Sequence, residues 1–135
     1  MDKKKIVWTY TNDKRDHHID VVELQEYVVI IQEKGVSHQE GAQKLLDFLI
    51  SYSDRKKHKI RMLIDTSNLN KIDAGARKIK GRILYQKDYV EKFTITGANF
   101  FVKCFVKLFT VLNKNQIPFA LFDGNEDALE WLLKD

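Results

Sequence analysis

The chain has 135 residues, 44% of them hydrophobic, and its 23 basic and 19 acidic side chains give a net charge of +4. This length predicts a single domain over residues 1–135 that folds without disulfides. The single cysteine, Cys104, excludes an internal disulfide and favours a reducing, cytoplasmic location. No apolar run follows the basic N-terminus, and the apolar stretch 99–112 is too short to span a bilayer, so we expect no signal peptide or transmembrane segment.

Three segments near the N-terminus are rich in β-branched and aromatic residues, as strands are. They are Lys5–Tyr10, Ile19–Val22 and Tyr27–Glu33. The short spacings between them predict an antiparallel meander.

Helical periodicity begins next, over His38–Ser53, and Ser37 has the capping-box spacing to Glu40. Ile60–Asp65 is a short apolar segment between two helical segments, which predicts a buried parallel strand. Asp73 is placed to cap a second helix over Ala74–Tyr89, whose inner face is expected to consist of Ala76, Ile79, Ile83 and Val90.

The remaining segments continue this alternation of strand and helix. We expect strands over Lys92–Gly97 and Ile117–Phe122, a helix over Phe100–Asn113, and a final helix capped by Asp123 or Asn125 that ends near Leu133. The predicted fold class is α/β, with a mixed β-sheet in which N-terminal antiparallel strands are followed by βαβα units.

Few residues in the sequence are candidates for a catalytic or metal-binding role. His17 and His18 are adjacent on a predicted strand and point to opposite faces, so we expect exposed histidines and no metal site. Cys104 lies among apolar residues and is expected to act as a small buried hydrophobe. Asp65 falls at the rim where parallel strands end, and an enzyme interpretation depends on it alone. A structural role in the turn is the favoured interpretation for Asp65, so we expect no catalytic residues and no cofactor.

The predicted third helix is apolar except for a narrow stripe, a wider apolar arc than a helix on one sheet face needs. Its phenylalanines are Phe100, Phe101, Phe105 and Phe109. Three interpretations stay open: a deeply buried helix, a homodimer contact, or the wall of a pocket for a lipid or other apolar small molecule.

Four local motifs together resemble the bacterial SpoIIAA-like proteins, small domains of the STAS superfamily whose fold is also likened to CRAL-TRIO lipid-binding domains. The motifs are Ile64-Asp65-Thr66-Ser67, Asp73-x-x-Ala76-Arg77, Phe93–Asn99 running into an apolar helix, and Phe122-x-x-x-Glu126-x-Ala128-x-x-Trp131-Leu132. The resemblance implies a SpoIIAA-like fold and a partner surface on the second helix and the loop before it. The residues of that surface are Asp73, Ala74, Arg77, Lys78 and Arg82.

Anti-sigma factor antagonists in this resembling group carry a phosphorylatable serine in a D-S-S-G motif. The matching stretch here is Asp73-Ala74-Gly75-Ala76, which keeps the aspartate and has no serine. The resemblance therefore predicts a non-catalytic module that binds a protein partner or a second copy of itself and lacks this phosphorylation site. The alternative is a carrier of an apolar ligand against the phenylalanines of the third helix.

The basic excess lies in 53–61, 71–92 and 103–116, whereas 19–50 and 123–135 are acidic. No RNP-type strand, GXXG loop or zinc finger accompanies the basic segments, so we do not expect nucleic-acid binding. The asymmetry is more typical of complementary contacts between protein surfaces.

Overall fold

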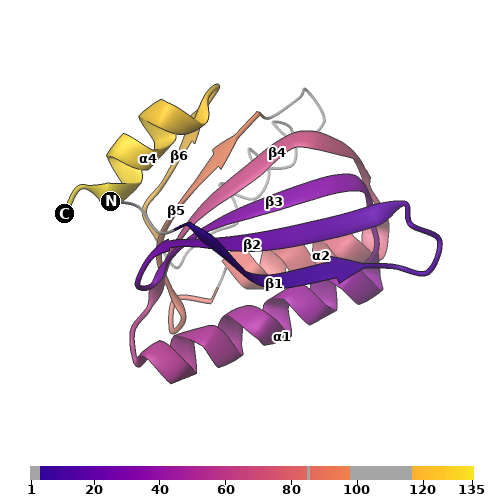
Figure 1. Cartoon of the computed structure of the whole chain (residues 1–135), viewed down its shortest axis with the longest axis horizontal. Coiled ribbons are helices and arrows are strands. Elements are labelled where there is room, and N and C mark those ends of the chain that lie inside the picture. The colour runs from indigo at the N-terminus through magenta and orange to yellow at the C-terminus, as the bar shows by residue number, and fades with distance from the viewer. Residues whose placement is uncertain (1–3, 85, 98–116) are drawn as a thin grey trace.

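A computed structural model of the chain describes residues 4–84, 86–97 and 117–135. One sheet contains six strands in the order β1-β2-β3-β4-β5-β6 (Figure 1). The strands are β1 (Lys5–Thr11), β2 (His17–Gln25), β3 (Val28–Ser37), β4 (Ile60–Ile72), β5 (Val90–Thr96) and β6 (Phe119–Phe122), and the helices are α1 (Gln39–Lys56), α2 (Ala74–Leu84) and α4 (Asn125–Leu133).

The pairing of neighbouring strands changes from antiparallel to parallel at β3. The pairs β1–β2 and β2–β3 are antiparallel, whereas β3–β4, β4–β5 and β5–β6 are parallel. A parallel pair needs a crossover connection, and α1 and α2 supply the connections that join β3 to β4 and β4 to β5. The predicted α/β class, with a meander followed by parallel strands, is confirmed.

Helices cover both faces of the sheet. The helices α1 and α2 lie side by side on one face, and α4 lies on the other over the β4–β6 half (Figure 1). Alternate residues of each strand face each layer, so Val29 and Ile31 join the core under α1 while Val28 and Ile30 join the smaller core on the α4 side.

Two predicted boundaries differ from the structure. The strand β4 continues to Ile72 instead of ending at Asp65, because its second half pairs with Lys34–Ser37 of β3. The helix α2 is described to Leu84, and Val90, which was expected to extend its inner face, begins β5. The inner-face residues Ala76, Ile79 and Ile83 are buried as expected.

Two predicted caps are wrong. The N-cap of α1 is His38, and the hydroxyl of Ser37 is buried without a hydrogen-bond partner among the described residues. The N-cap of α4 is Gly124, and the side chain of Asn125 instead donates to Asp65 and accepts a hydrogen bond from Thr96. The Asn125 side chain is held by tertiary contacts, which local spacing does not encode.

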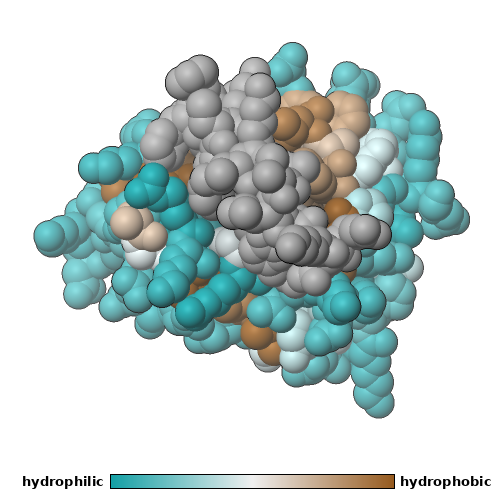
Figure 2. Space-filling view, turned by 180° about the vertical axis from the view of Figure 1, so that it is seen from behind, coloured by the Kyte–Doolittle hydropathy of each residue, from teal (hydrophilic) through white to brown (hydrophobic). Residues whose placement is uncertain are grey.

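Surface character varies around the molecule. Seen from behind, hydrophobic residues gather at the corner where β6 and α4 lie, and much of the remaining described surface is hydrophilic (Figure 2). Leu121 of β6 and Leu133 of α4 are among the exposed large hydrophobic side chains. Within the described ranges, no helix has the length and apolar character needed to cross a membrane.

Candidate partner-binding site

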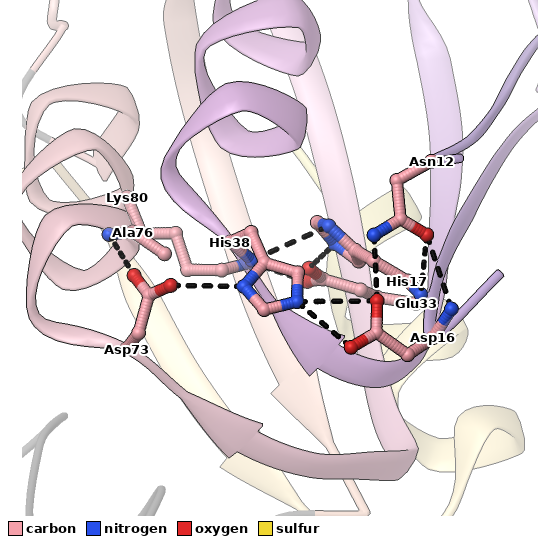
Figure 3. A network of polar contacts seen from close by, with 8 residues as sticks. All are labelled: Asn12, Asp16, His17, Glu33, His38, Asp73, Ala76 and Lys80. Atoms are coloured by element: carbon pink, nitrogen blue, oxygen red, sulfur yellow. Dashed lines mark hydrogen bonds and ion pairs between the residues drawn. The ribbon is translucent and has the colours of Figure 1, made fainter. Parts of the chain in front are cut away.

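The N-terminal end of α2 is the candidate site, because it contains the residues of the predicted partner surface. Three chain segments meet there: the loop before α2, the start of α1 and the turn between β1 and β2 (Figure 3). Asp73 begins the helix: its Oδ1 accepts a hydrogen bond of 2.8 Å from the Ala76 amide, as an N-cap does. The predicted cap at Asp73 is therefore confirmed.

His38 connects Asp73 to the β1–β2 turn. Its Nδ1 lies 3.0 Å from Asp73 Oδ2, and its Nε2 lies 3.1 Å from Asp16 Oδ2. Hydrogen bonds first to Asp16 and then to Asp73 raise the pKa of His38 above its ordinary value of 6.5. A protonated imidazole donates from both nitrogens, so His38 bridges two carboxylates when it is charged.

The two carboxylates are themselves organised. Asn12 donates to Asp16 over 2.6 Å, and this bond, followed by that of His38, lowers the pKa of Asp16. The Ala76 amide, and to a smaller extent His38, lower the pKa of Asp73. Both acids are therefore charged at neutral pH, and the loop between β1 and β2 is tied to the first turn of α2.

A buried polar row lies beneath this surface bridge. His17 Nε2 is 2.6 Å from Glu33 Oε2, and both side chains are almost completely buried. The His38 amide donates to His17 Nδ1 over 3.3 Å, so Nε2 carries the hydrogen that is donated to Glu33. Lys80 of α2 forms an ion pair with the other carboxylate oxygen of Glu33.

The Glu33 carboxylate remains ionised in this buried position. Burial alone would raise its pKa, but the Lys80 ammonium and the hydrogen bonds from His17 and Lys80 lower the pKa to about 2. Because Glu33 lies on β3 and Lys80 on α2, the ion pair fixes the helix against the sheet. The surface residues of α2 are thus presented on a rigid support.

The exposed face of α2 carries small and cationic residues. Ala74, Arg77, Lys78 and Arg82 are all exposed, whereas Asp73 is half-buried. No acidic residue lies within α2. The structure therefore places all five predicted partner-site residues at one end and along one face of this helix. The carboxylate of Asp73 is engaged in the bridge to His38.

Asp65, the residue behind the enzyme interpretation, organises a turn. Its Oδ1 accepts hydrogen bonds from the Ser67 amide and hydroxyl, and its Oδ2 accepts one of 3.1 Å from Asn125. Burial opposes the charged form, but these hydrogen bonds lower the pKa of Asp65. All of these contacts support the loop and the start of α4, the structural role that was favoured. No group of three or more histidine, cysteine or acidic side chains suited to a metal ion occurs among the described residues.

The candidate ligand residues Phe100, Phe101, Phe105 and Phe109 lie outside the described residues, as does Cys104. An apolar cavity of about 50 Å³ lies between the sheet and α2 among the described residues. Its lining includes Ile31, Ile83 and Ile95. Pockets for small molecules usually have several hundred Å³, so this cavity by itself is too small for a large apolar ligand.

Sequence reasoning missed the buried row. His17 was expected to be exposed, but it is buried on the core face of β2 with Ile19 and Val21. Period-two alternation with those residues was a signal for this position, and Glu33 alternates in the same way with Ile31 on β3. Nothing in the local sequence indicates that Lys80 reaches Glu33, because that contact depends on where α2 crosses the sheet.

Comparison with models of known protein families shows which family the chain belongs to. A family model described as a domain of unknown function, DUF7793, matches residues 29–134. The chain belongs to the DUF7793 family. No match was found for this DUF7793 chain among curated proteins.

Solved structures share the fold of this DUF7793 chain. An uncharacterised DUF3478 protein with a SpoIIAA-like fold from Shewanella loihica PV-4 is 19% identical, with a TM-score of 0.64 over 86% of this chain and 93% of that one. An unphosphorylated anti-sigma factor antagonist SpoIIAA is 11% identical, with a TM-score of 0.62 over 84% and 96%. An anti-sigma factor antagonist from Mycobacterium paratuberculosis is 17% identical, with a TM-score of 0.63 over 93% and 100%. The expected SpoIIAA-like, STAS-like fold is confirmed.

Proposed function

We propose that this chain is a single, non-catalytic STAS-like regulatory domain that acts in the cytoplasm by binding a protein partner. The exposed face of α2 and the loop before it form the binding surface. The observation that carries this proposal is the face formed by Ala74, Arg77, Lys78 and Arg82, which is exposed on a helix that is firmly anchored from beneath. Similarity to anti-sigma factor antagonists supports a role in regulation.

Regulation at this surface differs from a phosphorylation switch. Ala74 and Gly75 stand where the resembling antagonists have serines, and neither residue has a hydroxyl group. We therefore infer that a phosphate on these positions does not control binding. Asp73 keeps the capping carboxylate, so the start of the helix is defined without a modification.

Affinity capture with matched variants tests this proposal. The site variant replaces Arg77, Lys78 and Arg82 by alanine, and the control variant replaces three other exposed cations, Lys4, Lys59 and Lys87, by alanine. Both remove three positive charges, so non-specific effects of net charge are equal. Circular dichroism establishes that each variant is folded before it is used as bait in a lysate of the source organism.

The expected result is a protein retained by the wild type and by the control variant but lost with the site variant. Mass spectrometry identifies it, and a direct binding measurement with the purified partner follows. Capture of no protein, or equal capture by the site and control variants, would contradict the proposal.

A further inference from the structure

The charges of α2 differ from those of the other described helices. The helix α1 has Glu40 in its first turn and basic residues in its last, and α4 has Glu126 and Asp127 in its first turn. These charges complement the helix dipole, which is positive at the N-terminus. The first turn of α2 has no acidic residue, and Arg77 and Lys78 follow directly after it.

Cations with a structural role in this fold have partners within the chain. Lys80 pairs with Glu33, Arg61 pairs with Glu91, and Lys92 donates to backbone carbonyls at the end of α4. By contrast, neither Lys78 nor Arg82 forms an ion pair with a described acidic residue. Their positive charges therefore contribute little to folding and remain available to a partner.

Small residues bring a partner close to these cations. Ala74 and Gly81 lie along the same side of α2, and neither has a side chain that would keep another surface away from the helix. The attraction between opposite charges becomes stronger as water is excluded from between them, and close approach promotes this exclusion.

We propose that the partner presents an acidic protein surface to α2, with carboxylates that pair with Lys78 and Arg82 and lie beside Arg77. This inference rests on the proposed function, because it names the chemistry of the partner for that same surface. The face along Arg77, Lys78 and Arg82 has no carboxylate within α2 to oppose an acidic partner.

A nucleic acid fits this surface less well. Asp16 and Asp73 lie at the N-terminal end of α2 (Figure 3) and would repel a phosphate backbone that continued beyond the cationic face. An acidic protein surface can place its carboxylates over the cations alone. The short length of the cationic face therefore favours a protein.

A second copy of the chain is also a poor fit. Its acidic helix α4 lies on the opposite face of the sheet from α2 (Figure 1). Contact between α2 of one copy and α4 of a second would leave α4 of the first copy and α2 of the second free to bind further copies. Such head-to-tail contacts produce rings or filaments. We therefore expect the partner to be a different protein.

Two further variants test the inference with the partner that capture identifies. One replaces Arg77, Lys78 and Arg82 by glutamine, and the other replaces the same three residues by glutamate. Isothermal titration calorimetry gives Kd for the wild type and both variants at 50 and 500 mM NaCl. The same changes at Lys4, Lys59 and Lys87 provide the control.

We expect Kd to rise about 10-fold for the glutamine substitutions and about 100-fold for the glutamate substitutions at 50 mM NaCl, with the wild type about 10-fold weaker at 500 mM. Equal Kd values for the glutamine and glutamate substitutions on α2, with no effect of salt on the wild type, would reject the acidic character of the partner. That result would leave the assignment of the binding surface to α2 intact. Loss of capture after nuclease treatment, or a wild-type oligomer in ultracentrifugation that the glutamate substitutions dissociate, would also overturn the inference of an acidic protein partner. Failure of the alanine variant to reduce capture would instead reject the proposed function.

Discussion

Replacing Lys80 by methionine removes the ammonium that neutralises Glu33 and keeps a side chain of similar length against the apolar residues beside it. The pKa of Glu33 is lowered from 4.5 to about 2 in the fold, although burial acts in the opposite direction. A depression of this size corresponds to about 3 kcal/mol of stability at neutral pH. Because the folded pKa is lowered, this stability is present above pH 4.5 and is lost as the pH falls through about 2.

The substitution Lys80→Met is therefore expected to destabilise the protein by about 3 kcal/mol at pH 7, since it leaves a buried carboxylate without its cation. With a urea dependence of about 1.5 kcal/mol per molar, the unfolding midpoint falls by about 2 M. At pH 4 the loss is smaller, because the unpaired Glu33 can take up a proton.

Equilibrium urea unfolding at pH 7 and pH 4 measures this effect. Lys78→Met is the matched control, because Lys78 lies on the same helix but is exposed, and we expect a change of no more than about 0.5 kcal/mol. Adding Glu33→Gln to Lys80→Met should recover part of the lost stability. A loss below about 0.5 kcal/mol for Lys80→Met at pH 7, or an equal loss at both pH values, would refute this account of the ion pair.

Substitutions at His38, Asp73, Gly35 and Gly124 test further contacts of the fold. Because the pKa of His38 is raised, its imidazole is fully charged below pH 6.5, and the bridge weakens as the pH rises through the raised pKa. The stability difference between wild type and His38→Gln in urea should therefore be larger at pH 5.5 than at pH 9. Equal differences at the two pH values would contradict the bridge. Asp73→Ala should cost about 1 kcal/mol in the same assay and Asp73→Ser much less, because serine also caps helices. Gly35 has a φ of +83°, and a Cβ there would lie 2.1 Å from the Asp16 carbonyl oxygen. Gly35→Ala should therefore lower the free energy of unfolding by more than about 2 kcal/mol. Gly124→Ala is the control, because no atom lies within 4 Å of the added carbon, and it should cost less than about 1 kcal/mol.

The sequence predicted the fold well where the information is local. Enrichment in β-branched and aromatic residues identified β2 and β3, and helical periodicity identified α1 and the inner face of α2. The alternation of strand and helix after β3 then required parallel pairing. The second half of β4 was missed, because Asn68, Leu69, Lys71 and Ile72 form a strand through pairing with β3 rather than through a pattern of their own.

The candidate site was predicted in part. The motif at Asp73 located the cap and the exposed residues of α2, since capping depends on short spacing. The bridge through His38 and the buried row of His17, Glu33 and Lys80 join residues that are far apart in the chain. Such contacts depend on the crossing of α2 over the sheet, which no local pattern in one sequence specifies.

Site-specific photo-crosslinking in living cells tests the central claim most directly. A benzophenone amino acid replaces Lys78 on the exposed face of α2, and in a matched variant it replaces Gln32, which is exposed on the opposite face of the sheet. We expect light to join a specific protein to the chain labelled at position 78 and not to the chain labelled at position 32. A specific adduct at position 32 with none at position 78 would contradict the assignment of α2 as the binding surface.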